Sequence, residues 1–205
     1  MEIKDMIVTP MGYIETMLIH CGVLLKGDFT LKDGSRSPYF FDLGRVNKGA
    51  DIYFLMTCLD REVQGREIEF NIIVGPPYKG IALAAGMSFA TGKPFDYYRK
   101  ESKDHGEGGN WVTKALKPKM KVLIVDDVII GGTAKQEAMD MVAAAGAEVA
   151  GIAVILDRNK LGADQGDSLI SYQGIPVISL VTMKEVLDKY QEIRDSKDPI
   201  EEECL

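Results

Sequence analysis

Two adjacent carboxylates followed by a glycine-rich turn are the most chemically informative feature of the sequence. Asp126 and Asp127 come directly after the apolar run 122–125, and the Gly-Gly-Thr at 131–133 leads into an expected helix. The first backbone N–H groups of a helix, with the positive end of its dipole, bind anions. Carboxylates beside a phosphate would repel it, but they accept hydrogen bonds from sugar hydroxyls or from the water on a metal ion. The segment is therefore interpreted as a sugar-phosphate site, although an ordinary strand–turn–helix with an acidic turn would show the same pattern.

A second candidate segment gathers basic side chains beside glycines. Within seven positions lie Arg99, Lys100, Lys103 and His105. A protein core cannot bury such a cluster without anionic partners, and three of the four residues at 106–109 are glycine, which predicts a mobile loop. A cationic loop of this kind is suited to closing over a polyphosphate, and the imidazole could exchange a proton near neutral pH. A solvated surface loop is the alternative.

The elements that must position these residues alternate between strand and helix patterns. Buried strands are expected at 70–74, 122–125 and 149–156, each followed or preceded by a helix of apolar period 3.6. The predicted fold class is therefore α/β, with a central, mainly parallel sheet flanked by helices. Ligands of such sheets bind beyond the carboxyl ends of the strands, where the acidic pair lies. Capping boxes are expected at Thr133 with Gln136 and at Thr182 with Glu185.

Length and composition limit the class of protein. The 205 residues fit one domain, expected at 1–194, with a charged tail at 195–205. Lys and Arg number 24 and Asp and Glu 31, a net charge of −7 that argues against nucleic acid and against an anionic membrane surface as partners. Three cysteines, Cys21, Cys58 and Cys204, are odd in number and widely spaced, which favours free thiols and a cytoplasmic location.

Four segments together resemble a known family. The first, VLIVDDVIIGGTA, is similar to the phosphoribosyl pyrophosphate (PRPP) loop of type I phosphoribosyltransferases. The others, FTLKDGSRSPYFFDLG, GPPYKGIALA and YRKESKDHGEGGN, resemble the bacterial orotate phosphoribosyltransferases, over about residues 27–158. The resemblance implies transfer of ribose 5-phosphate from PRPP to orotate, giving orotidine 5′-monophosphate in pyrimidine biosynthesis. It also implies the type I phosphoribosyltransferase fold with a small hood, which the expected domain forms largely from residues 1–45.

The same resemblance implies roles for individual residues. It places against PRPP the residues Lys32, Tyr78, Lys79, Arg99, Lys100, Lys103, His105, Asp126, Asp127, Val128, Ile129, Ile130, Gly131, Gly132, Thr133 and Ala134. It places against orotate the residues Phe40, Phe41, Ile130 and Arg158. Catalytic roles are implied for Lys103, His105, Asp126 and Asp127. By their positions alone, Lys79 and Arg158 would be interpreted as exposed residues at a helix start and a strand end.

Cofactor and assembly are implied in the same way. Mg²⁺ is expected mainly on PRPP and water, with no direct protein ligand. Lys103 and His105 are expected to reach PRPP in the neighbouring subunit, so the active sites of a homodimer would be shared. A cis peptide is expected between Pro77 and Tyr78.

One position departs from the family pattern. Ile130 stands where the family has a threonine whose hydroxyl contacts orotate. One alternative that this residue leaves open is a phosphoribosyltransferase for another base. A second, independent of Ile130, is a PRPP-sensing regulator without turnover, although such regulators usually bind nucleic acid and the net negative charge argues against it.

Overall fold

A computed structural model describes residues 12–30, 34–100, 110–130, 133–158 and 171–196. Its helices are α1 (Tyr13–His20), α2 (Gly49–Gly65), α3 (Lys79–Thr91), α4 (Thr133–Ala144) and α5 (Met183–Asp195), with a short 3-10 turn, η2 (Leu43–Arg45). Its strands are β1 (Leu24–Thr30), β2 (Arg36–Phe41), β3 (Ile72–Gly75), β4 (Phe95–Tyr97), β5 (Lys121–Ile129), β6 (Glu148–Asp157), β7 (Ser171–Tyr172) and β8 (Ile175–Thr182). No helix within these ranges is long and apolar enough to cross a membrane.

The central sheet has the strand order β4-β3-β5-β6-β8-β7 among the described residues. Every neighbouring pair from β4 to β8 is parallel, and only the edge pair β7–β8 is antiparallel. The predicted mainly parallel α/β sheet is confirmed. In such a sheet the carboxyl ends of neighbouring strands lie at one edge, which is where β3, β5 and β6 end beside one another.

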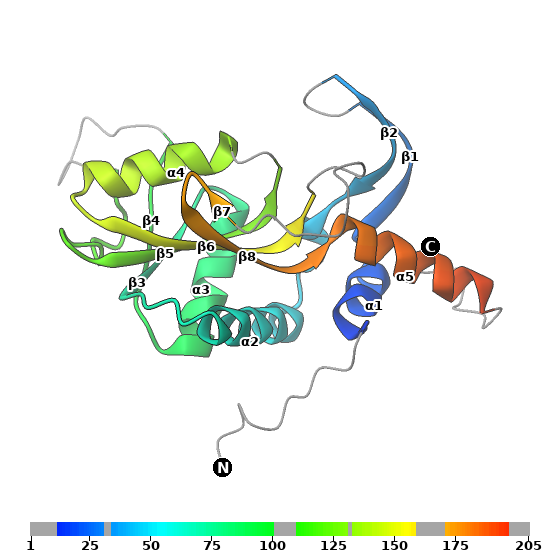
Figure 1. Cartoon of the computed structure of the whole chain (residues 1–205), viewed down its shortest axis with the longest axis horizontal. Coiled ribbons are helices and arrows are strands. Elements are labelled where there is room, and N and C mark those ends of the chain that lie inside the picture. Colours follow the sequence, from blue (N-terminus) through cyan, green and yellow to red (C-terminus); the bar gives the residue numbers. More distant parts are fainter. Residues whose placement is uncertain (1–11, 31–33, 101–109, 131–132, 159–170, 197–205) are drawn as a thin grey trace, which may run out of the picture.

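Helices cover both faces of this sheet, α2 and α3 on one side and α4 on the other (Figure 1). Successive strand residues point to opposite faces. On β5 the odd positions, such as Leu123 and Val125, pack in the core with α2 and α3. The even positions Val122 and Ile124 pack in the core with Ala138 of α4. Because the register continues, the two acidic residues of β5 face opposite layers.

A separate two-stranded antiparallel sheet, β1–β2, projects from this body (Figure 1). Its last residue, Phe41, is buried in the core that also contains Leu18 of α1 and Tyr190 of α5. The chain from β2 therefore returns into the main core at Phe41 and delivers the following residue, Asp42, to the edge of the sheet.

One expected local feature differs from the structure. The strand expected at 122–125 continues as β5 to Ile129, because β6 supplies pairing partners that far: Asp126 pairs with Val154 and Ile129 with Asp157. The acidic pair thus lies within the strand rather than in the loop after it. The Thr182–Glu185 capping box is present. The capping box expected at Thr133 stays a prediction, because the side chain of Thr133 lies outside the described part of the structure; the side-chain oxygen of Gln136 accepts a hydrogen bond from Gln173 (2.7 Å).

Candidate active site

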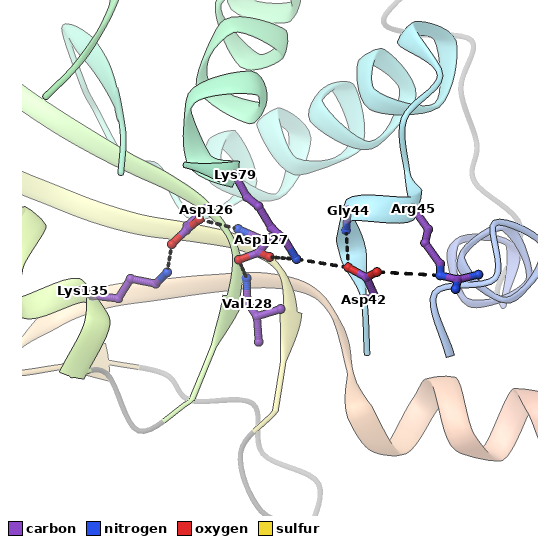
Figure 2. Close-up of polar contacts among 8 residues, drawn as sticks. All are labelled: Asp42, Gly44, Arg45, Lys79, Asp126, Asp127, Val128 and Lys135. Atoms are coloured by element: carbon purple, nitrogen blue, oxygen red, sulfur yellow. Dashed lines mark hydrogen bonds and ion pairs between the residues drawn. The ribbon is translucent and has the colours of Figure 1, made fainter. Parts of the chain in front are cut away.

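Asp126 and Asp127 each face a different lysine (Figure 2). Asp126 points toward α4, where Lys135 contacts its Oδ2 atom. Asp127 points toward α3, where the Nζ atom of Lys79 lies 3.3 Å from its Oδ2 atom. Both pairings follow from the alternation of side chains along β5. The acidic pair is therefore two separate ion pairs, not one doubly charged patch.

The Asp126–Lys135 pair is buried. The Lys135 side chain is only 2% exposed and that of Asp126 14%. The Oδ1 atom of Asp126 accepts a hydrogen bond from the backbone N–H of Asp127 at 2.9 Å. Burial raises the pKa of Asp126 above its ordinary value, and the ammonium of Lys135 offsets part of that rise. Both oxygens of this carboxylate are thus fixed by the protein.

The Asp127–Lys79 pair is open to solvent on its lysine side. Lys79 is 49% exposed, and its Nζ atom also lies 3.3 Å from the Oδ1 atom of Asp42. Asp127 is held from behind, because its Oδ1 atom accepts the backbone N–H of Val128 at 2.8 Å. Partial burial lowers the pKa of Lys79, but the carboxylates of Asp127 and Asp42 outweigh it and raise the pKa. The lysine is therefore a charged group that an incoming anion can reach.

A tight turn places Lys79 at the start of α3. The peptide between Pro77 and Tyr78 is cis, as the resemblance implies. A Cβ atom on Gly80 would lie 2.7 Å from Cδ of Pro76 and 3.0 Å from the backbone oxygen of Val125. Only glycine allows β5 and this turn to approach so closely. The close approach brings Lys79 to the acidic pair.

The aromatic ring of Tyr78 is exposed, and the Nζ atom of Lys100 lies 5.2 Å from its centre. Two residues that the sequence assigns to PRPP are thus neighbours. Arg99 donates its backbone N–H to the carbonyl of Asn110 (3.0 Å), which joins the two described ends of the basic segment.

The residues assigned to orotate are only partly brought together. Phe41 is buried, and the guanidinium carbon of Arg158 lies 5.9 Å from the centre of its ring. Arg158 also donates its backbone N–H to Ile129 (3.0 Å), next to the exposed Ile130. Phe40 points to the opposite face of β2, as the alternation predicts, and contacts Phe29 instead.

Several predicted site residues lie outside the part of the chain that the structure describes. These are Lys32, Lys103, His105, Gly131 and Gly132. Thr133 and Ala134 form the start of α4, next in sequence to Lys135. Val128 and Ile129 are the last residues of β5.

Sequence reasoning missed two residues of this site, Lys135 and Asp42. A signal for Lys135 was present: it shares a helical face with Ala138 and Val142, both of which are fully buried. A lysine on a buried face needs an acidic partner. Asp42 directly follows a strand. Its position in the sequence shows which face of the strand it shares with Phe40, but not which side chain it contacts.

This arrangement can hold an anionic sugar. The two carboxylates can accept hydrogen bonds from sugar hydroxyls, and the exposed Lys79 supplies positive charge. The start of α4, which can bind a phosphate, follows within a few residues. Among the described residues, no group of three His, Cys, Asp or Glu side chains is placed to hold a metal ion.

The fold and this edge site coincide with a known domain. A family model described as "Phosphoribosyl transferase domain" matches residues 50–178. That range contains β3, α3, β5, α4 and β6, and with them both ion pairs. The class of protein is therefore a phosphoribosyltransferase, a pentosyl-transferring enzyme.

Individual relatives narrow this class. The orotate phosphoribosyltransferase of Marinobacter nauticus is 46% identical over 178 residues, covering 83% of each chain. The crystal structure of the Francisella tularensis orotate phosphoribosyltransferase shares 28% identity over 88% of this chain and 96% of that one, with a TM-score of 0.66. The Leishmania donovani UMP synthase shares 27% identity with a TM-score of 0.73 over 91% of this chain, which spans only 39% of that longer protein. The chain belongs to the orotate phosphoribosyltransferase family.

Proposed function

We propose that this protein transfers ribose 5-phosphate from PRPP to N1 of orotate, releasing pyrophosphate and forming orotidine 5′-monophosphate for pyrimidine biosynthesis. Family membership supports the reaction. The observation that carries the assignment to this edge of the sheet is the pairing of Asp126 and Asp127 with one lysine each, directly before the start of α4. Carboxylates can accept hydrogen bonds from the hydroxyls of a pentose, and the start of a helix can bind its phosphate.

PRPP lies along the carboxyl ends of β3 and β5 in this proposal. Its 5′-phosphate binds the backbone N–H groups of residues 131–134, at the positive end of α4. The ribose hydroxyls donate to Asp126 and Asp127. Around the pyrophosphate stand Lys32, Tyr78, Lys79, Arg99, Lys100, Lys103 and His105.

The reaction needs no protein nucleophile. The bond from the anomeric carbon to pyrophosphate lengthens toward an oxocarbenium-like state, so the protein must hold both reactants and neutralise the departing anion. Lys79 is suited to this task, since it is half exposed and can exchange its carboxylate partners for phosphate oxygens. His105 assists the leaving group by proton donation.

Orotate lies near the end of β2 and the end of β6. The guanidinium of Arg158, already above the Phe41 ring, binds the orotate carboxylate as a bidentate fork. Phe40 and Ile130 complete this part of the site.

Mg²⁺ is proposed to bind together with PRPP, the donor substrate. Its preferred ligands are hard oxygens, and the carboxylates available here are already engaged by lysines. We propose that PRPP oxygens and water hold the ion, which when bound neutralises part of the diphosphate charge.

The working unit is a homodimer in which Lys103 and His105 of one subunit serve the site of the other. A cytoplasmic location agrees with Cys21 and Cys58, neither of which forms a disulfide within the described part of the chain. The domain comprises residues 1–194, with the hood built largely from residues 1–45 and the tail at 195–205 outside it.

A pyrophosphate-release assay tests the proposed activity. With PRPP and Mg²⁺ present, orotate should support turnover, while uracil, hypoxanthine and adenine should not. Turnover with one of the other bases would favour the alternative that the exposed Ile130 raises, a phosphoribosyltransferase of different base preference. PRPP binding without turnover of any base would indicate a regulator.

A further inference from the structure

A buried lysine stands behind the acidic pair, and the proposed reaction gives it no role. Lys135 is almost completely buried, on the first turn of α4, and its ammonium contacts only one carboxylate among the charge contacts described here, that of Asp126. Burying a lysine costs free energy unless it is paired. Its position beside the start of α4 raises the question of what this pair does for the sugar-phosphate site.

The two lysine–carboxylate pairs differ in how easily a ligand can break them. Lys79 is 49% exposed and divides its charge between two carboxylates, so an incoming anion can displace it from Asp127. Lys135 is 2% exposed and has no path to a ligand without unpacking α4 from the sheet, where its neighbours on the helix face, Ala138 and Val142, are fully buried. One pair is therefore exchangeable and the other permanent.

Charge explains why the permanent pair is useful. Two free carboxylates next to a phosphate site would repel the ligand's phosphate groups. With Lys135 bound to Asp126, the acidic pair bears one net negative charge instead of two. The same contact fixes the Asp126 side chain, since its second oxygen is held by the backbone N–H of Asp127.

We propose that Lys135 is a positioning residue for the PRPP site: it holds the Asp126 carboxylate charged and oriented, so that this carboxylate binds a ribose hydroxyl without repelling the phosphate groups. This inference rests on the proposed function only for the identity of the sugar phosphate. Lys135 acts through Asp126 and does not touch the substrate.

The first test is Lys135→Met, which keeps the length of the side chain and removes its charge. A contact made equally in the ground and transition states affects KM rather than kcat. We expect the KM for PRPP to rise at least tenfold, the KM for orotate to stay within twofold, and kcat to fall less than threefold. The PRPP affinity measured by calorimetry should fall in parallel. The matched control is Lys121→Met, at the other end of β5, which breaks the exposed Lys121–Glu69 pair and should change none of these values.

The second test is a double-mutant cycle. If Lys135 works only through Asp126, Asp126→Asn combined with Lys135→Met should bind PRPP within threefold of Asp126→Asn alone. The same comparison decides the matter if Lys135→Met alone does not fold, because the combined variant leaves no unpaired buried charge. An unchanged PRPP affinity in Lys135→Met, a combined variant more than threefold weaker than Asp126→Asn, or a combined variant that fails to fold where Asp126→Asn folds would each overturn the inference.

Failure of the proposed function gives a different result. Calorimetry with PRPP does not require a base, so a wild-type protein that binds PRPP but does not use orotate refutes the reaction and leaves the Lys135 test intact.

Discussion

Lys79 connects three parts of the chain that are distant in sequence. It begins α3, and its ammonium lies between Asp127 of β5 and Asp42 after β2 (Figure 2). Without ligand the lysine is held by carboxylates, and with PRPP bound the proposal gives it pyrophosphate oxygens.

The raised pKa of Lys79 predicts how stability varies with pH. A lysine whose pKa is higher in the folded state contributes stability below its unfolded pKa of 10.5, and that contribution is lost as pH rises through the folded pKa. Wild-type protein should exceed Lys79→Met in free energy of unfolding by about 0.2–1 kcal/mol, the range of solvent-screened ion pairs, between pH 7 and about 9.5. Above about pH 10.5 the difference should shrink. Urea unfolding over this pH series measures it, and a difference that grows with pH would contradict the assignment.

Replacing Ile130 with threonine is predicted to strengthen orotate binding. The Ile130 side chain is 57% exposed just after β5, at the position where the family resemblance implies a threonine in contact with orotate. Ile130→Thr should restore one hydrogen bond to a charged ligand, worth ~1.5–3 kcal/mol, and lower the KM for orotate about tenfold to a hundredfold.

Steady-state kinetics with Ile130→Val as the control separate the hydroxyl from the shape, because valine supplies only the branched shape. An orotate KM equal in all three proteins would remove position 130 from the orotate site.

At this scale the sequence predicted some of the site and missed some. The acidic pair was predicted because adjacent acids before a glycine-rich turn are a local pattern, whereas Lys79 was assigned to the site only by the family resemblance. Lys135 and Asp42 were missed because their partners are set by the packing of α4 and β2 on the sheet edge. The predicted neighbourhood of Phe40 and orotate stays a prediction, since Phe40 contacts Phe29 in the ligand-free structure.

At the scale of elements, the turn between β3 and α3 decides where Lys79 stands. Gly75 and Gly80 face one another across this turn, and a Cβ on Gly75 would lie 2.3 Å from the backbone oxygen of Gly80. The turn is therefore packed too closely for a residue with a side chain at either glycine position. The strand β3 is buried throughout and the inner face of α3 packs in the core, which resists a shift that would make room.

Gly80→Ala should disturb both stability and binding. Its new methyl group would contact Pro76 and the backbone of Val125, and overpacking of this kind costs about 1–3 kcal/mol. The turn must move to relieve it, and Lys79 moves with the turn, so the KM for PRPP should rise.

The control is Gly65→Ala, at the end of α2, where an added Cβ meets nothing within 4 Å. It should leave KM unchanged and be neutral or stabilising by up to about 1 kcal/mol. Chemical denaturation and kinetics on both variants make the comparison, and equal behaviour of the two would argue against a tightly packed turn.

The sequence was informative about elements and less so about their ends. The hydrophobic periods of the helices and strands predicted the order of these elements and the parallel sheet, because each period depends only on residues that are close in sequence. The length of β5 could not be predicted from its own residues, since acids and glycines usually end a strand. It continues to Ile129 because β6 supplies pairing partners as far as Asp157.

At the scale of the whole molecule, the central sheet, the end of the β1–β2 sheet and the described start of the basic segment meet at one edge. β2 delivers Asp42, β5 delivers the acidic pair, and β6 ends beside Arg158. The remaining cationic groups, Lys103 and His105, are proposed to come from a second copy of the chain.

Mixing two inactive variants tests this shared site. Lys103→Ala should lower kcat about a hundredfold or more, because it removes charge stabilisation from the leaving group. Asp127→Ala should be similarly impaired. After the two are mixed and allowed to exchange subunits, half of the dimers would be hybrids with one intact site of two, so about a quarter of wild-type activity should return. If mixing restores nothing while exchange is demonstrated by native mass spectrometry, each site belongs to one chain.

The most direct test of the account is a crystal structure of the protein with PRPP and Mg²⁺. The account predicts electron density for the pentose at the carboxyl ends of β3 and β5, with its hydroxyls on Asp126 and Asp127 and its 5′-phosphate on the backbone of residues 131–134. Lys79 should then contact pyrophosphate, while Lys135 should still contact Asp126. Density for PRPP elsewhere on the molecule, with the Lys79–Asp127 contact unchanged, would contradict it.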